Sequence, residues 1–474
     1  MNHPKIHYTL YILIPLVFLT ACVGAAAKPR IQLAPCKVGI YRALCGSLQV
    51  YENRATHRGR TIELNIVVIK AQSEAPAPDP IFYLAGGPGV AATEDALNTM
   101  QVLGSANYKR DLVFVDQRGT GNSNKLVCPQ SIDPTRQVEE LRACVANLGS
   151  DPSAYTTAWA MDDVDDVRAA LGYDRINLYG GSYGATAAQV YILRHESHVR
   201  AAALDGISLL DVPMFERYPI SSQEALELMF SRCEADAACH SAFPDLGQEF
   251  AGALALLNRA PIPQPINDPS TGQPVLLTTE IFRTTVHKAL VSTQTAALAP
   301  LFIHLIYLED WNGLAIFLAP FMSPASETPQ WNLMNLTIVC NEDWAKIRPE
   351  ETQGLSAGSY LKYADVRALT VPEEICAAMP RPQAKALYGP VKRSMVPMIL
   401  VNGEVDPQDP PENVAGAKQR YPNSLNLIAP GQAHSYTGIS CRASIIADFM
   451  ERGSVAGLNT DCLKVVQLPA FVVP

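Results

Sequence analysis

The sequence has no C-x-x-C pair, no evident internal repeat and no excess of basic residues. These absences exclude several functional classes of protein. Lys and Arg number 37 against 46 Asp and Glu, which gives a formal net charge of −9. Nucleic-acid binding depends on clustered basic side chains, so this balance argues against it. The eleven cysteines lack the C-x-x-C spacing of zinc or redox motifs. We therefore expect no metal, no other cofactor and no nucleic-acid partner.

Long apolar runs are also scarce, and the run at the N-terminus is short. Residues 8–19 are apolar, and Lys5 is the only formally charged side chain before them. This length is typical of a signal-peptide core rather than a transmembrane span. Residues 19–22, Leu-Thr-Ala-Cys, resemble a bacterial lipobox in which Cys22 is lipidated and becomes the mature N-terminus. Cleavage after the alanines at 25–27 is the alternative.

Residues 1–27 are therefore predicted to be a signal peptide of lipoprotein type. We expect an exported bacterial protein that is lipid-anchored in the cell envelope, or periplasmic or secreted if Cys22 is not lipidated. The lipid would be its only contact with the membrane. The sequence leaves the oligomeric state open.

The cysteines that remain after Cys22 are even in number, ten in all. In an exported protein this predicts five disulfides. Pairing of nearest neighbours is the simplest arrangement, although sequence alone does not fix the connectivity. That arrangement joins Cys36 to Cys45, Cys128 to Cys144, Cys233 to Cys239, Cys340 to Cys376, and Cys441 to Cys462.

Apolar runs alternate with helical patterns through much of the chain, and this order predicts an α/β fold. A chain of 474 residues with 48% hydrophobic residues can bury a large core. Strands that alternate with helices favour a mostly parallel sheet with helices on both faces. We expect helices at 162–171 and 185–193, and strands at 61–70, 81–84, 111–115, 176–179, 199–205, 397–401 and 425–428.

Between the predicted strands at 199–205 and 397–401 the sequence pattern becomes helical, with no convincing series of strands. Helical stretches lie at 223–230, 248–257, 279–290 and 297–308. We interpret residues 206–390 as a helical cap inserted into the sheet domain, whose two parts are residues 28–205 and 391–474.

A serine lies at the junction of a predicted strand and a predicted helix. Residues 180–184 read Gly-Gly-Ser-Tyr-Gly, which is the pattern G-x-S-x-G. A tight turn of this kind needs small neighbours, and it exposes the serine hydroxyl above the sheet, as in the nucleophile elbow of α/β-hydrolases. A glycine-rich turn with a bystander serine is the alternative. The strand before and the helix after it favour Ser182 as the nucleophile.

A serine hydroxyl needs a base, and in α/β-hydrolases the acid and then the histidine follow the serine along the chain. Of the nine histidines, only His434 lies in the C-terminal part of the sheet domain. His195 and His198, at the end of the elbow helix, are expected on the surface.

The acid of the triad should follow the preceding strand. Asp406 does so, 28 residues before the histidine, and would fix the imidazole tautomer and stabilise the imidazolium. Glu404 and Asp409 are the alternatives.

An oxyanion hole needs two backbone donors. The N–H of Tyr183, directly after the nucleophile, is the first. The second should come from the loop at 85–89, and we expect Gly87, because Pro88 has no N–H to donate.

Four motifs together resemble the prolyl and tripeptidyl aminopeptidase family of serine peptidases. They are Ala-Gly-Gly-Pro-Gly at 85–89, Asp-Gln-Arg-Gly-Thr-Gly-Asn-Ser at 116–123, Gly-Gly-Ser-Tyr-Gly at 180–184 and Asp-Pro at 406–407. The resemblance covers nearly all of the mature chain and implies an α/β-hydrolase core with a helical cap. The chain departs from it at Asp409, where relatives carry a small hydroxylated residue, and at Ala433, where glycine is common.

The resemblance also implies a peptide substrate with a free α-amino end, which needs a carboxylate to hold its ammonium group. Glu342, two residues after Cys340, resembles the cap carboxylate of these relatives, and Asp343 is next to it. A hydrated charge on a cap loop is the alternative reading of Glu342. Trp331 and Trp344 are candidates to line the pocket, or else buried aromatic residues.

The sequence thus predicts an exported serine aminopeptidase of prolyl or tripeptidyl type. The first alternative is an esterase or other acyl hydrolase that uses the same triad. The remote alternative is a non-catalytic binding protein on a hydrolase scaffold.

Overall fold

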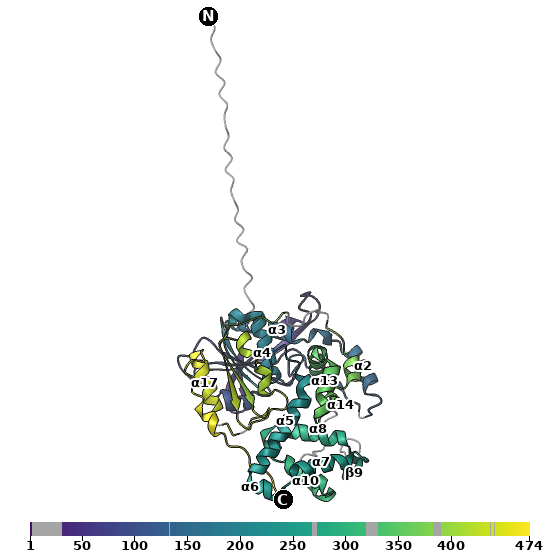
Figure 1. Cartoon of the computed structure of the whole chain (residues 1–474). Helices are drawn as coiled ribbons and strands as arrows, with labels where there is room; N and C mark the ends of the chain where they lie inside the picture. The colour runs from purple at the N-terminus through teal and green to yellow at the C-terminus, as the bar shows by residue number, and fades with distance from the viewer. Residues whose placement is uncertain are drawn as a thin grey trace.

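The computed structural model describes residue 1 and residues 31–474, apart from 132, 268–272, 319–329, 383–389, 437 and 440. In this part of the chain the centre of the fold is a nine-stranded sheet (Figure 1). Its strands, in spatial order, are β1 (Ala34–Val38), β2 (Tyr41–Tyr51), β3 (Thr61–Ile69), β5 (Leu112–Val115), β4 (Ile81–Leu84), β7 (Ile176–Gly181), β8 (Val199–Asp205), β12 (Met398–Gly403) and β13 (Ser424–Ala429).

The sheet is mostly parallel, as the sequence predicts. Pairs β1–β2, β2–β3 and β3–β5 are antiparallel, and every later pair, from β5–β4 to β12–β13, is parallel. Parallel strands place their carboxyl ends at one edge of the sheet, where α/β proteins hold their sites. The loops after β4, β7, β8, β12 and β13 therefore meet at that edge.

Helices cover both faces of the sheet, because its central strands are apolar on both sides. In β4, Phe82 and Leu84 pack on one face and Ile81 and Tyr83 on the other. The first face carries α3 (Thr157–Leu171) and α4 (Tyr183–His195), and the second carries α1 (Ala96–Leu103) and α17 (Arg442–Arg452). Figure 1 shows α17 across the sheet from α3 and α4.

A cap of helices is inserted between β8 and β12, as predicted. Figure 1 shows it on one side of the sheet domain. It contains α5 (Met214–Ala235), α6 (Ala237–Ala242), α7 (Leu246–Leu257), α8 (Thr279–Leu290), α9 (Thr293–Ala296), α10 (Ala299–Tyr307), α11 (Trp311–Leu318), α12 (Leu333–Ile338), α13 (Pro349–Leu355), α14 (Tyr363–Leu369) and α15 (Glu373–Ala378).

The cap also contains strands, where the sequence analysis expected no series of them. β9 (Ile262–Asn267) and β10 (Pro274–Leu277) form a hairpin, and β11 (Gln330–Asn332) pairs with β6 (Val127–Pro129) outside the cap. The sequence pattern missed β9 because two prolines, Pro263 and Pro265, interrupt it. Proline cannot donate to a ladder, but a two-stranded ribbon leaves one edge unpaired and tolerates it.

Two helices, α5 and α3, begin more than one turn before the starts that their sequence patterns predict. α5 continues through Pro219, although a proline in a helix interior removes a hydrogen bond. α3 begins at Thr157 because Thr156 caps it by accepting the N–H of Trp159. The two remaining α-helices outside the cap are α2 (Gln137–Asn147) and α16 (Ala417–Arg420).

The structure forms the five disulfides with the nearest-neighbour pairing. Cys340–Cys376 lies within the cap, while the C-terminal residues return to it: Val472 donates its N–H to the carbonyl of Ala297. Cys22 and all but the first residue of the predicted signal peptide lie outside the described residues. In the part that is described, no helix is both long and apolar enough to cross a bilayer.

Candidate active site

Ser182 lies on a tight turn that needs a glycine on each side. Its φ of 54° and ψ of −126° are strained for a residue with a side chain, a feature that collects at functional sites. A Cβ on Gly184 would lie 2.0 Å from the carbonyl oxygen of Leu84, and one on Gly180 would lie 2.4 Å from that of Gly184. Glycine is therefore required on both sides, and the serine is the one side chain at the apex of the turn.

His434 and Asp406 come from the loops after β13 and β12, and they form a hydrogen-bonded pair. Nδ1 of His434 lies 2.9 Å from Oδ2 of Asp406. The other carboxylate oxygen accepts the N–H groups of Gln408 at 2.8 Å and Asp409 at 2.9 Å. The loop thus fixes the carboxylate, and the carboxylate orients the imidazole with Nε2 as the free end.

The register of the sheet brings this pair beside the serine. The N–H of Ser182 donates to the carbonyl of Asp205 at 2.9 Å, and Gly206 follows at the end of β8. A Cβ on Gly206 would lie 3.0 Å from Cε1 of His434 and 3.1 Å from its Nδ1. The imidazole ring therefore lies against Gly206, the residue after the one whose carbonyl accepts the N–H of Ser182.

The charges around His434 favour its protonated form. Burial lowers the pKa of the imidazole, but the negative charge of Asp406, its hydrogen bond and the charge of Asp409 outweigh burial and raise the pKa to about 9. Glu404, the other alternative acid, is exposed and instead accepts the N–H of Gly431 at 2.7 Å. Of the three candidate carboxyls, Asp406 and Asp409 face the histidine.

One segment of the cap bonds the histidine loop directly before and directly after His434. Thr293, at the start of α9, accepts the N–H of Ala433 on its hydroxyl at 2.9 Å. Its own N–H donates to the carbonyl of Ser435 at 3.2 Å, and the N–H of Ser435 donates to Val291 at 3.0 Å. No sequence motif marks Thr293, because it lies about 140 residues before the loop that it holds.

A tyrosine two residues after the histidine ties the same loop to the sheet. The hydroxyl of Tyr436 donates to the carbonyl of Val401 at 2.9 Å and accepts the N–H of Gly206 at 3.2 Å. No sequence motif marks Tyr436, although its position two residues after the predicted base was a usable signal.

The two expected oxyanion donors lie in segments next to the serine: Tyr183 directly follows it, and Gly87 belongs to a loop that contacts it. α4 begins at Tyr183, so its N–H belongs to the first turn, whose donors lack acceptors within the helix. In the loop after β4, a Cβ on Gly86 would lie 3.5 Å from Cβ of Ser182, so Gly87 follows a residue in contact with the nucleophile. Asn335 of the cap donates to the carbonyl of Pro88 at 3.0 Å and supports this loop.

Glu342 connects the cap to the residue next to the nucleophile. It is 1% exposed, and its Oε1 accepts the N–H of Thr157 at 2.9 Å. The Thr157 hydroxyl lies 2.9 Å from the hydroxyl of Tyr183. Burial, and after it the charge of Glu342, raises the pKa of Tyr183. Burial raises the pKa of Asp343 to about 7, although Lys346 opposes the rise.

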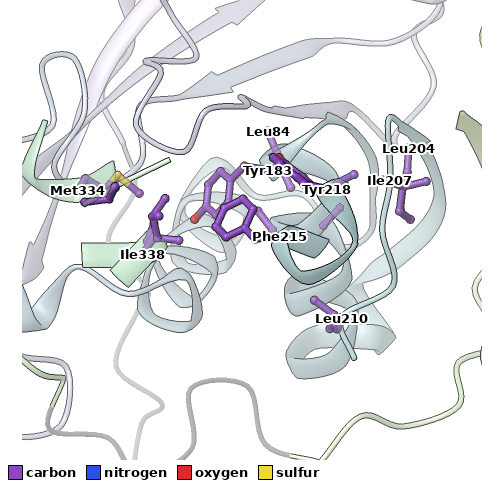
Figure 2. Packing of buried hydrophobic residues seen from close by; sticks show 14 of the residues in the cluster. Leu84, Tyr183, Leu204, Ile207, Leu210, Phe215, Tyr218, Met334 and Ile338 are labelled. Carbon is purple, nitrogen blue, oxygen red and sulfur yellow. The ribbon is translucent and has the colours of Figure 1, made fainter. Parts of the chain in front are cut away.

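Apolar side chains of the cap and the core share one cluster at the site (Figure 2). The labelled members include Leu84 and Tyr183 from the core and Phe215, Tyr218, Met334 and Ile338 from the cap. Trp331 and Trp344 are partly buried and pack at the edge of this cluster. Trp344 also stacks on Arg367, whose guanidinium carbon lies 3.9 Å from the ring centroid. Both tryptophans thus have packing roles.

Two clusters among the described residues place metal-ligand atoms within 4.8 Å of one another: Asp165 with His195 and His198, and Asp406 with Asp409 and His434. In the first, Arg168 Nε lies 2.7 Å from Asp165, and its positive charge opposes a second cation. Its two histidines are 20% and 34% exposed, in keeping with their expected place at the surface.

Comparison with known proteins agrees with this fold. The model of the alpha/beta hydrolase fold matches residues 79–232, and that of TAP-like protein matches residues 362–462. The chain is 23% identical over 461 residues to the serine protease Hip1 of Mycobacterium tuberculosis (strain ATCC 25618 / H37Rv), covering 89% of this chain and 87% of the relative.

Two further relatives match parts of the chain. The proline iminopeptidase of Neisseria gonorrhoeae is 27% identical over 139 residues, 29% of this chain and 36% of the relative. The tripeptidyl aminopeptidase of Streptomyces lividans is 26% identical over 190 residues, 34% of this chain and 35% of the relative.

The fold and these matches define an enzyme of the α/β-hydrolase class. Within it, the chain is a serine peptidase that resembles the prolyl and tripeptidyl aminopeptidases.

Proposed function

We propose that this serine peptidase is an exported exopeptidase that cleaves near a free N-terminus with Ser182, His434 and Asp406 as its triad. The observation that carries the proposal is the His434–Asp406 pair, held at 2.9 Å and packed against Gly206 beside the strained serine turn. Three separate loops converge there, as acyl transfer by a serine requires.

The proposed reaction follows from this arrangement. The hydroxyl oxygen of Ser182 attacks the scissile carbonyl carbon while Nε2 of His434 takes its proton, and Asp406 stabilises the imidazolium. The N–H groups of Tyr183 and Gly87 donate to the oxyanion. His434 then gives the proton to the leaving amine. Water, deprotonated by His434, hydrolyses the acyl-enzyme and releases the N-terminal fragment.

Glu342 is the proposed partner of the substrate's ammonium group. An ammonium that leaves water in a closed pocket needs a carboxylate. Glu342 supplies one from the cap, one hydrogen-bonded residue away from Tyr183. The cap around it would block longer N-terminal extensions. The names of the aminopeptidase relatives support a substrate of this kind.

A fluorophosphonate probe and a substrate panel test the triad and the substrate class. The enzyme should be labelled by the probe and should cleave peptides with a free amine much faster than their N-acetylated forms. Ser182→Ala should abolish labelling and turnover, a loss of about 10⁶-fold for a serine nucleophile.

Retained labelling of Ser182→Ala would refute the nucleophile. Equal cleavage of acetylated and free peptides would refute the exopeptidase, and a strong preference for p-nitrophenyl esters would favour the esterase alternative. Lack of labelling of the unmodified enzyme would favour the non-catalytic binding protein.

Export and lipidation at Cys22 complete the proposal. The five disulfides support export, because such bonds persist in oxidising compartments. Cys22→Ser should move the enzyme from the membrane fraction to the soluble fraction. An unchanged fractionation would instead favour cleavage after residue 27.

A further inference from the structure

Asp409 is a second buried carboxyl at the ring nitrogen that already has Asp406 as its partner. Its side chain is in a residue that is 3% exposed, and its Oδ2 lies 3.5 Å from Nδ1 of His434. The corresponding oxygen of Asp406 lies 2.9 Å from the same nitrogen. One imidazole N–H therefore faces two carboxyls from a single loop.

The two carboxyls have different hydrogen-bond partners. Asp406 accepts two backbone N–H groups and the imidazole. Asp409 accepts the hydroxyl proton of Ser208, which in turn accepts Nδ2–H of Asn413 at 2.8 Å. The carbonyl of Asp409 accepts Nδ2–H of Asn402 at 2.8 Å. The position of Asp409 is thus fixed by side chains that take no part in the proposed reaction.

We infer that Asp409 is a positioning residue that acts through His434 as a second acid. It places a second negative charge beside the imidazolium that forms during the reaction. When Asp406 is neutralised, Asp409 partly replaces it in stabilising that imidazolium. The inference rests on the proposed triad and goes beyond it, because a triad needs one acid.

The charge of Asp409 responds to pH in the working range. Burial raises its pKa to about 7, His434 opposes the rise and the neighbouring Asp406 adds to it. Above that pH, a second negative charge faces Nδ1, and like charges this close ionise in sequence rather than together. Among the described residues, the other titratable groups that interact with this cluster are Tyr218, His287 and Asp343 of the cap and Tyr436 of the histidine loop.

A double-mutant cycle in the full-length enzyme tests the inference. We would measure kcat/KM against pH for Asp406→Asn, Asp409→Asn and the double variant. Removing the acid of a triad costs on the order of 10⁴-fold, and we expect that loss only in the double variant. Asp406→Asn alone should keep at least about tenfold more activity than the double variant, because the carboxylate of Asp409 still faces the Nδ1–H group of His434 and stabilises the imidazolium.

The pH profile separates this role from a structural one. The reaction needs neutral His434, so its raised pKa moves the acid limb of kcat/KM to higher pH. Asp409→Asn removes a negative charge near the ring and should move that limb to lower pH by at least about half a unit. Asp461→Asn, which neutralises an exposed carboxylate in an ion pair with Lys464, should not move it.

Two results would overturn the inference: equal activities of Asp406→Asn and the double variant, or an unshifted limb in Asp409→Asn. Thermal unfolding of each variant checks that it folds. Ser208→Ala keeps the carboxyl of Asp409 but removes its hydrogen-bond donor, so it tests the same role without replacing Asp409. Failure of the triad itself would look different: the Ser182→Ala variant would still be labelled, or Asp406→Asn would cost no activity whether Asp409 is present or replaced.

Discussion

The sheet domain and the cap contribute to the site by different means. The sheet places reacting groups through backbone register: Gly181 pairs with Asp205, and so the serine turn lies beside Gly206 and the histidine ring. The cap contributes side chains from distant positions, such as Thr293, Asn335 and Glu342, which bond to loops of the sheet domain. In the proposed mechanism, therefore, chemistry depends on the sheet, while substrate choice and loop support depend on the cap.

This division follows from how each region is held together. A parallel sheet allows little freedom at its strand ends, because shifting one strand changes every neighbour. Cap helices can change length and sequence as long as a few side chains still reach the loops. One disulfide, Cys340–Cys376, ties the segment that carries Glu342 to α15, so the cap restrains the part that would bind substrate.

Neutralising Glu342 should have the largest effect among the changes that test this comparison. Glu342→Gln keeps an oxygen to accept the N–H of Thr157, so the fold should survive. Losing a buried charged partner costs about 2–5 kcal/mol of binding free energy. The value of kcat/KM for free-amine peptides should fall by the ratio that corresponds to this free energy. Ester hydrolysis should hardly change, because the triad is intact.

The neighbouring carboxyl provides the matched control for that experiment. Asp343→Asn should cost less, because burial raises the pKa of Asp343 to about 7 and leaves it partly uncharged at neutral pH. A larger loss in Asp343→Asn than in Glu342→Gln would assign the ammonium to Asp343. Equal losses on peptides and esters would show that the cap residue affects chemistry, against the comparison.

A methyl group at the end of β8 tests the contribution of the sheet. Gly206 has a φ of 53°, and its Cβ would lie 3.0 Å from Cε1 of His434. Gly206→Ala should displace the ring, and a shift of about 1 Å in a catalytic group can cost about 10²-fold in rate. The measurements are kcat and the rate of fluorophosphonate labelling.

Gly172→Ala controls for backbone strain alone. Gly172 has a φ of 85° at the end of α3, and its Cβ would meet nothing within 4 Å. Both variants should lose about 1–2 kcal/mol of stability, because both force a side chain into the left-handed region. Only Gly206→Ala should lose rate, and similar rates in the two variants would contradict the assigned position of His434.

The sequence predicts the two regions unequally, for the same physical reason. Ser182 lies between a strand and a helix that are contiguous with it, and the apolar runs of β4, β5 and β8 are visible as local patterns. The order of serine, acid and histidine follows from the order of strand ends. Local patterns therefore predict seven of the nine strands of the sheet and the candidate triad residues, but they miss β1, β2, α1 and α17.

The cap is harder to predict because its contacts span long stretches of chain. The pattern gave four helical stretches but missed the β9–β10 hairpin and the first half of α5. It also could not show that Thr293 bonds to the loop of His434, or that Asp409 reaches the same ring nitrogen as Asp406. These contacts depend on how separate segments pack, which no local spacing encodes.

Removing one hydroxyl from the cap should give the smallest effect and the finest test of the division. Thr293 accepts the N–H of Ala433, which is buried, and Thr293→Val keeps the shape of the side chain but leaves that donor unsatisfied. The expected cost is about 1–3 kcal/mol of stability. Because the lost bond is next to His434, kcat should also fall by about threefold to tenfold, while KM should change little.

Thr295→Val is the matched control, since the hydroxyl of Thr295 donates to the carbonyls of Ala289 and Ser292 within the cap. It should lower the unfolding temperature and leave kcat as it is. If Thr293→Val and Thr295→Val lose stability alike and neither changes kcat, then the cap supports the fold but does not position the histidine, and the role of the cap would be confined to the substrate.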